Sequence, residues 1–113
     1  MEDRFLQQMK KGVLEMLVLE TVCDRATYGY ELLGRLGEGS GGLFALKEGT
    51  LYPLLHTLEK QHWVSSYTKL TPSGRERKYY RLTSQGREQL EYKEQEWKLF
   101  SEKVNAVLSF SGA

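Results

Sequence analysis

Residues 47–61 constrain the fold most, because their leucines recur with the period of an α-helix. Spacings of three and four residues gather these leucines into one apolar stripe. The stripe consists of Leu51, Leu54, Leu55 and Leu58. The opposite side has hydrogen-bonding groups and no carboxylate at its centre. Pro53 lacks a backbone N–H and is tolerated best in a first turn, which predicts a helix that starts near Thr50. Taken alone, this pattern also fits an ordinary amphipathic helix packed against a core.

A β-hairpin is predicted directly after this helix. Its strands, residues 63–69 and 77–82, are rich in aromatic, β-branched and hydroxyl side chains that alternate with period two. Between them, residues 71–74 have proline second and glycine fourth, as a type I turn favours. The inner face of the hairpin is predicted to carry Val64, Tyr80 and Leu82.

Positive charge gathers at the tip of this hairpin. Arg75, Arg77, Lys78 and Arg81 fall within seven residues and are opposed only by Glu76. A charge run is often only a solvated face. Next to a helix whose polar face tolerates phosphate, this one is better explained as a wing laid along a nucleic-acid backbone. The formal net charge is only +1, so affinity for DNA has to come from this local cluster.

Three further helices are expected around this centre. Residues 4–23 predict a helix that is apolar almost all round toward its end and needs partners on several sides. Thr27 is expected to cap a second helix, and the glycine-rich residues 37–42 then form a mobile connector. Thr83 is expected to cap the last helix, which runs to about Val107 and is roughly 36 Å long. The predicted fold class is mainly α with a small β-hairpin (α+β), a winged helix-turn-helix followed by one long helix.

The last helix carries a second apolar stripe with the spacing of a coiled-coil seam. Its members are Leu90, Trp97, Phe100, Val104 and Val107, with Lys93 as an interruption. The stripe is longer than a small core covers from one side, which predicts a homodimer. The alternative is that the first helix of the same subunit covers it. We therefore expect residues 1–82 to form a winged-helix DNA-binding domain and residues 83–113 a dimerisation helix.

Enzymatic and metal-binding classes find no support in the sequence. The glycines of residues 37–42 match G-x-G-x-x-G, but a helical pattern precedes them where a dinucleotide loop needs a strand. His56 and His62 have no partners at ligand spacing, so no metal site and no cofactor are expected, and His62 is expected at the turn into the hairpin. The lone Cys23 excludes an internal disulfide, suits a reducing compartment and is expected to be a small core residue rather than a redox sensor. Neither a signal peptide nor an apolar run of ~18 residues is present, so no membrane partner is expected.

A series of short motifs follows the chain in a familiar order. They are KGVLEMLVL at 11–19, YGYEL at 28–32, EGTLYPLL at 48–55, LE at 58–59, WV at 63–64, GR at 74–75, RKYY at 77–80 and LTSQG at 82–86. Over nearly the whole chain they resemble the PadR family of bacterial transcriptional regulators, named for the phenolic acid decarboxylase repressor. The resemblance implies a winged-helix domain and a dimer held by the C-terminal helix, as in the short subfamily. In some short members a tryptophan of each last helix stacks on a planar aromatic drug, and Trp97 is at the matching place.

The resemblance implies a sequence-specific, DNA-binding transcriptional regulator in the cytoplasm. Such a regulator is most simply a ligand-responsive repressor, acting as a homodimer on a pseudo-palindromic operator whose major grooves lie roughly 34 Å apart. Candidates for base-edge contacts are Thr50, Tyr52 and His56; candidates for phosphate contacts are Lys11, Lys47, Arg75, Arg77 and Lys78. The candidate effector is a planar aromatic molecule at Trp97. The alternative is a winged-helix module that binds another protein and no DNA.

Overall fold

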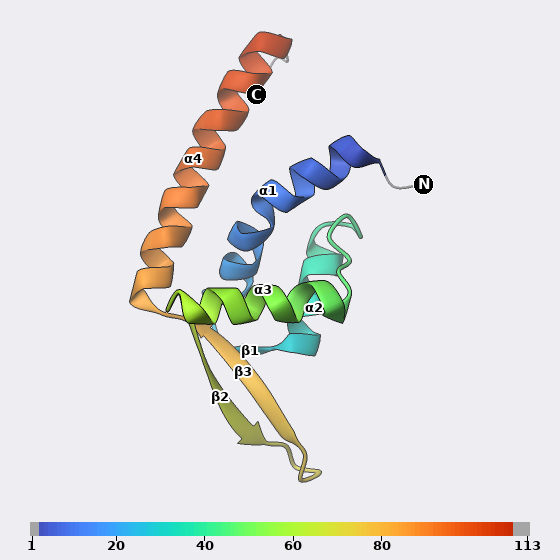
Figure 1. Cartoon of the computed structure of the whole chain (residues 1–113), viewed down its shortest axis with the longest axis vertical. Helices are drawn as coiled ribbons and strands as arrows, with labels where there is room; N and C mark the ends of the chain where they lie inside the picture. The colour runs from blue at the N-terminus through green and yellow to red at the C-terminus, as the bar shows by residue number, and fades with distance from the viewer. Residues whose placement is uncertain (1–2, 110–113) are drawn as a thin grey trace.

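The computed structural model describes residues 3–109, which form four helices and a small antiparallel sheet (Figure 1). In chain order the elements are α1 (Arg4–Thr21), β1 (Thr27–Tyr28), α2 (Gly29–Gly39), α3 (Glu48–Lys60), β2 (Val64–Leu70), β3 (Glu76–Leu82) and α4 (Ser84–Leu108). The strand order is β1-β3-β2. The predicted fold class, a mainly helical chain with a winged helix-turn-helix and one long last helix, is confirmed.

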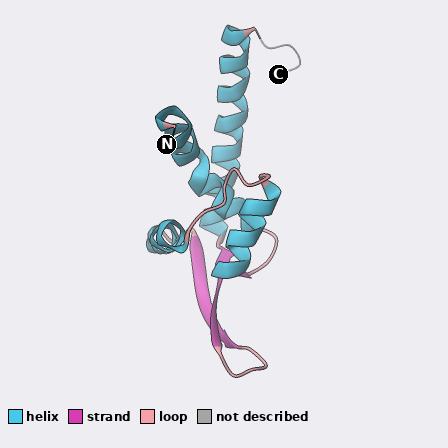
Figure 2. Cartoon of the chain, turned by 90° about the vertical axis from the view of Figure 1, so that its right-hand side faces the viewer, coloured by secondary structure: helices cyan, strands magenta, loops and turns pink. Residues whose placement is uncertain are grey.

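The hydrophobic core lies where α1, α2 and α3 meet the base of the sheet. Leu51, Leu55 and Leu58 of α3 are fully buried, and Leu54 is half-buried, so the predicted apolar stripe faces this core. Figure 2 shows the helices gathered around the upper end of the sheet, while the hairpin projects away from them on the opposite side from α4. The hairpin and α4 therefore extend from the core in opposite directions.

The start of α2 differs from the prediction. Thr27 is not the N-cap: it is fully buried in the two-residue strand β1, and Tyr28 is the N-cap residue. The Thr27 hydroxyl donates to the Arg25 carbonyl oxygen at 3.1 Å and accepts from the Arg35 guanidinium at 3.2 Å. These partners satisfy the buried hydroxyl, which leaves nothing to cap the helix.

Helix boundaries near the glycine-rich segment also differ from expectation. Helix α2 continues to Gly39, so the connector consists of residues 40–47 instead of 37–42, and Phe44 within it is buried. Helix α3 begins at Glu48, two residues before the predicted start, which places Pro53 inside the helix rather than in its first turn. The missing N–H of Pro53 leaves the Gly49 carbonyl without its helical donor. Gly49 is exposed, so water can satisfy that oxygen.

The turn and the caps around the hairpin agree with the sequence. Gly74 N–H donates to the Thr71 carbonyl oxygen at 2.9 Å, which closes the predicted turn. Thr83 caps α4 by accepting from Gly86 N–H at 2.9 Å, and its hydroxyl donates to the His62 carbonyl oxygen at 2.6 Å. The base of the hairpin is therefore hydrogen-bonded to the start of α4.

Candidate nucleic-acid interface

The eight residues predicted to contact DNA are all exposed. They are Lys11, Lys47, Thr50, Tyr52, His56, Arg75, Arg77 and Lys78. Seven of them lie on α3, at its start or on the hairpin that follows it, whereas Lys11 lies on α1, which packs against α2 and α4. Figure 1 shows α1 on the opposite side of α3 from the hairpin. The structure thus brings seven candidates to one region of the molecule and leaves Lys11 apart.

Tyr52 is held against the start of α2 instead of projecting freely. An added Cβ on Gly29 would clash with the end of the Tyr52 side chain, so the tyrosine can keep this position only beside a glycine and would have to swing away from a larger residue. Partial burial raises the pKa of the Tyr52 phenol, and the Glu48 carboxylate adds to the rise. The phenol therefore remains neutral at physiological pH and can donate a hydrogen bond.

The cations of the hairpin do not share one face. Successive residues of a strand point to opposite sides of the sheet, and Arg77 and Lys78 are neighbours in β3. The Arg77 guanidinium carbon lies 4.3 Å from the centre of the Tyr28 ring, on the side away from the core. Lys78 Nζ lies 3.7 Å from Glu59 Oε1, on the side that faces the end of α3. A single phosphate strand lying against one face could therefore meet only one of the two.

A row of tyrosines supports Arg77. Tyr28 of β1 pairs with Tyr79 of β3, and their rings meet edge to face with centroids 5.6 Å apart. Tyr67 of β2 stacks on Tyr79 at 5.5 Å. Rigid aromatic faces favour a guanidinium that lies flat on them. The row therefore joins the three strands and holds the Arg77 guanidinium in one place, a role of Tyr28 that the sequence did not single out.

The predicted seam on α4 divides into two parts, and the assignment of its first residue, Leu90, to the dimer interface is corrected. Leu90 is only 4% exposed and belongs to the core of its own subunit, so it has no surface left for a partner. Lys93 also faces its own subunit: its Nζ lies 3.3 Å from Glu15 Oε1 of α1 and 5.3 Å from the centre of the Trp63 ring. The first two turns of the stripe therefore pack within the chain.

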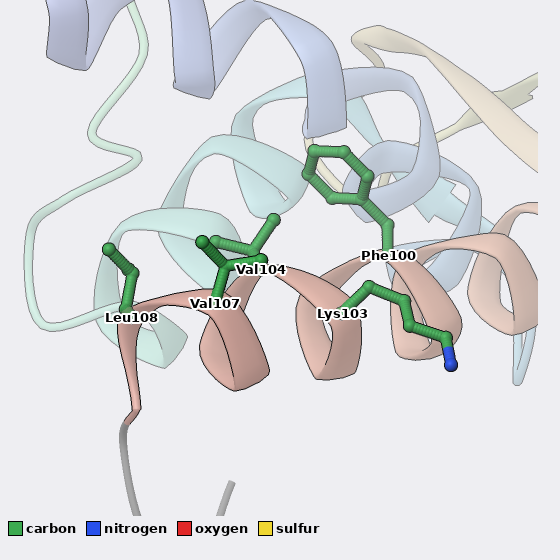
Figure 3. Close-up of a pocket in the computed structure, with 5 residues that line it drawn as sticks. All are labelled: Phe100, Lys103, Val104, Val107 and Leu108. Atoms are coloured by element: carbon green, nitrogen blue, oxygen red, sulfur yellow. The ribbon is translucent and has the colours of Figure 1, made fainter.

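The second part of the stripe remains uncovered. Trp97 is 48% exposed and Phe100 63% exposed, and Val104 and Val107 are exposed as well. Figure 1 shows α1 and α4 diverging toward the end of α4. Phe100, Val104 and Val107 line a shallow apolar hollow there, shown in Figure 3. The first helix of the same subunit therefore does not cover this second part of the stripe.

The described part of the chain gives no support for a metal site or a membrane-spanning helix. Within residues 3–109 no three His, Cys, Asp or Glu side chains come together in a way that could hold a metal ion. No helix of this part combines the length and apolarity that a membrane crossing needs. Cys23 is half-buried at the edge of the core, and burial, with the nearby Glu20 carboxylate, raises the pKa of its thiol. A raised pKa keeps the thiol protonated and poorly reactive.

Known proteins share this arrangement. Residues 18–92 match the PadR-like family of transcriptional regulators. A PadR-like transcriptional regulator from Bacillus cereus is 38% identical, and the superposition covers 92% of this chain and 99% of that one with a TM-score of 0.80. A Streptococcus transcriptional regulator is 39% identical over 88% of this chain and 96% of that one, with a TM-score of 0.77. A PadR family regulator from Eggerthella lenta is 32% identical over 92% and 88%, with a TM-score of 0.82. This chain therefore belongs to the PadR-like family of transcriptional regulators.

Proposed function

We propose that this PadR-like regulator is a cytoplasmic repressor that binds a pseudo-palindromic operator as a homodimer and responds to a planar aromatic ligand. The observation that carries the proposal is the exposed polar face of α3 beside a cationic hairpin. Helices of this kind enter the major groove, and cations on a wing hold the phosphate backbone. No acidic residue lies at the centre of that face to repel DNA.

The proposed contacts follow from the positions of the side chains. Thr50, Tyr52 and His56 lie on the exposed side of α3 and are assigned to base edges or nearby phosphates. Lys47 at the start of α3 and the cations of the hairpin are assigned to phosphates. Arg77 and Lys78 point to opposite faces, so they suit the two backbones on either side of a minor groove better than one backbone.

Dimerisation is assigned to the uncovered end of α4. Residues 84–108 would pair with the same helix of a second copy and so bury the exposed Trp97 and Phe100 side chains. A two-fold arrangement would present the two α3 helices to successive major grooves about 34 Å apart, and such an arrangement would favour a pseudo-palindromic operator. Residues 3–82 would then serve as the DNA-binding unit. Two such subunits bound across a promoter would repress most simply by occluding it.

Trp97 is the proposed ligand contact. Two indoles that face each other across the two-fold axis can sandwich a flat aromatic cation between their π faces. The exposed fraction of Trp97 leaves room for such stacking in the free subunit. If a ligand at the seam weakens DNA binding by some factor, DNA must weaken ligand binding by the same factor.

Binding to DNA is tested by fluorescence anisotropy with a labelled duplex at several salt concentrations. The expected result is an affinity whose logarithm falls linearly with the logarithm of salt, with a slope of about −0.9 for each phosphate contact. Absence of salt-dependent DNA binding would refute the proposed repressor function. The polar face of α3 would then be a surface for a protein partner.

Ligand response is tested by titrating planar cationic dyes against tryptophan fluorescence. Trp97→Phe is the matched control, because Trp63 also emits and is half-buried elsewhere. We expect dyes to quench the wild type more than Trp97→Phe and to release DNA. If no dye does either, Trp97 serves packing alone.

A further inference from the structure

The carboxylate of Glu59 joins the end of α3 to both strands of the hairpin. Glu59 lies in the last turn of α3, and its side chain is 33% exposed. Its Oε2 accepts a hydrogen bond from the Ser66 hydroxyl of β2, and its Oε1 lies 3.7 Å from Lys78 Nζ of β3. One acidic side chain therefore contacts a hydroxyl and a cation on the hairpin face that is turned toward α3.

Lys78 is the more mobile partner of this pair. Its side chain is 54% exposed, and its ammonium also lies 5.6 Å from the centre of the Tyr80 ring. Glu59 is fixed by the helix and by Ser66, whereas the lysine is a flexible stem with a point charge at its end. Ion pairs that are exposed to this degree are weak, so a phosphate can take the place of the carboxylate.

We propose that Glu59 is a positioning residue that competes with the DNA backbone for Lys78 and so limits binding to DNA of arbitrary sequence. While the ion pair is closed, Lys78 neutralises no phosphate and displaces no counterion. Sequence-independent affinity comes almost entirely from such phosphate contacts. A carboxylate that withholds one cation therefore lowers the affinity for DNA of arbitrary sequence. This inference rests on the proposed DNA binding.

The Glu59→Gln variant tests the proposal, because glutamine keeps a hydrogen-bond acceptor for Ser66 but loses the charge that holds Lys78. Binding to a random-sequence duplex is measured by anisotropy across a range of salt. We expect binding about twofold to fivefold tighter per subunit, in line with the weakness of exposed ion pairs. The log–log salt slope should steepen by about 0.9 per subunit as Lys78 gains a phosphate. Circular dichroism confirms that the variant is folded.

Two comparisons separate this effect from simple removal of a negative charge. In a Lys78→Gln background, Glu59→Gln should change neither affinity nor slope, because the competing cation is gone. Glu76→Gln is the matched control: Glu76 lies on the same strand face and forms no ion pair with any described residue. A wild type that binds no DNA refutes the proposed function itself. If the wild type binds DNA, three results would overturn only the role of Glu59. These are an unchanged salt slope for Glu59→Gln, an equal effect of Glu59→Gln in the Lys78→Gln background, and an effect equal to that of Glu76→Gln.

Discussion

Truncation of Trp97 should separate the proposed dimer. A partner helix that covers the exposed half of this side chain would bury roughly 100 Å² of the 150–250 Å² that an aromatic residue offers. At ~25 cal/mol/Å² this burial contributes about 2.5 kcal/mol per subunit, or about 5 kcal/mol per dimer. Area bookkeeping gives an upper limit, so we expect Trp97→Ala to raise the dimer dissociation constant by about 100-fold, equivalent to ~2.8 kcal/mol, which is less than that limit.

Sedimentation equilibrium over a range of micromolar concentrations measures this constant. Tyr92→Ala is the control, because Tyr92 is an exposed aromatic residue of α4 that lies about 140° around the helix from Trp97. Its loss should leave the dimer intact, whereas adding Val104→Ala to Trp97→Ala should weaken association further. A monomeric wild type, or equal effects of the Tyr92 and Trp97 substitutions, would refute the assignment of the seam.

Three further substitutions probe the wing, the packing and the charges. Arg77→Ala should flatten the log–log salt slope of DNA binding by about 1.8 per dimer, whereas Lys98→Ala on exposed α4 should not, and an unchanged slope would place Arg77 away from DNA. Gly86→Ala places a Cβ against the Trp63 carbonyl oxygen and should lower the free energy of unfolding, measured by urea denaturation, by about 1–3 kcal/mol. Gly29→Ala meets only a movable side chain and should lower it less. Partial burial, together with the neighbouring Glu20 carboxylate, raises the pKa of Glu94, so folding disfavours its charged form and stability falls as pH rises past the ordinary value of 4.5. Glu94→Gln should therefore stabilise the protein at neutral pH and lose that advantage below about pH 4, and equal urea midpoints at neutral pH would contradict this.

Periodic patterns predicted the fold because they report which side of an element is buried. The leucines of α3 and the alternation of Val64 and Tyr80 both identify buried faces correctly. The strand β1 was missed because two residues carry no period, and Thr27 suits a strand as well as a cap. Leu90 was misassigned for a different reason: a seven-residue repeat does not distinguish packing within a subunit from packing between subunits.

The candidate site was predictable only in its composition. The sequence identified which cations belong to the hairpin, and the period of two already places Arg77 and Lys78 on opposite faces. The partners of those cations were not predictable, because Tyr28 reaches Arg77 through the pairing of β1 with β3, and Glu59 reaches Lys78 through the angle between the hairpin and α3. That angle depends on tertiary packing, including the hydrogen bond between Thr83 and His62.

Footprinting on the DNA upstream of its own gene tests the central claim most directly. A homodimer that reads DNA with two α3 helices should protect two half-sites whose centres lie about one helical turn, roughly 34 Å, apart. The half-sites should be related by an approximate two-fold axis, and protection should weaken as salt rises. A salt-independent pattern, a single unpaired half-site, or no protection while the protein is folded would contradict the account.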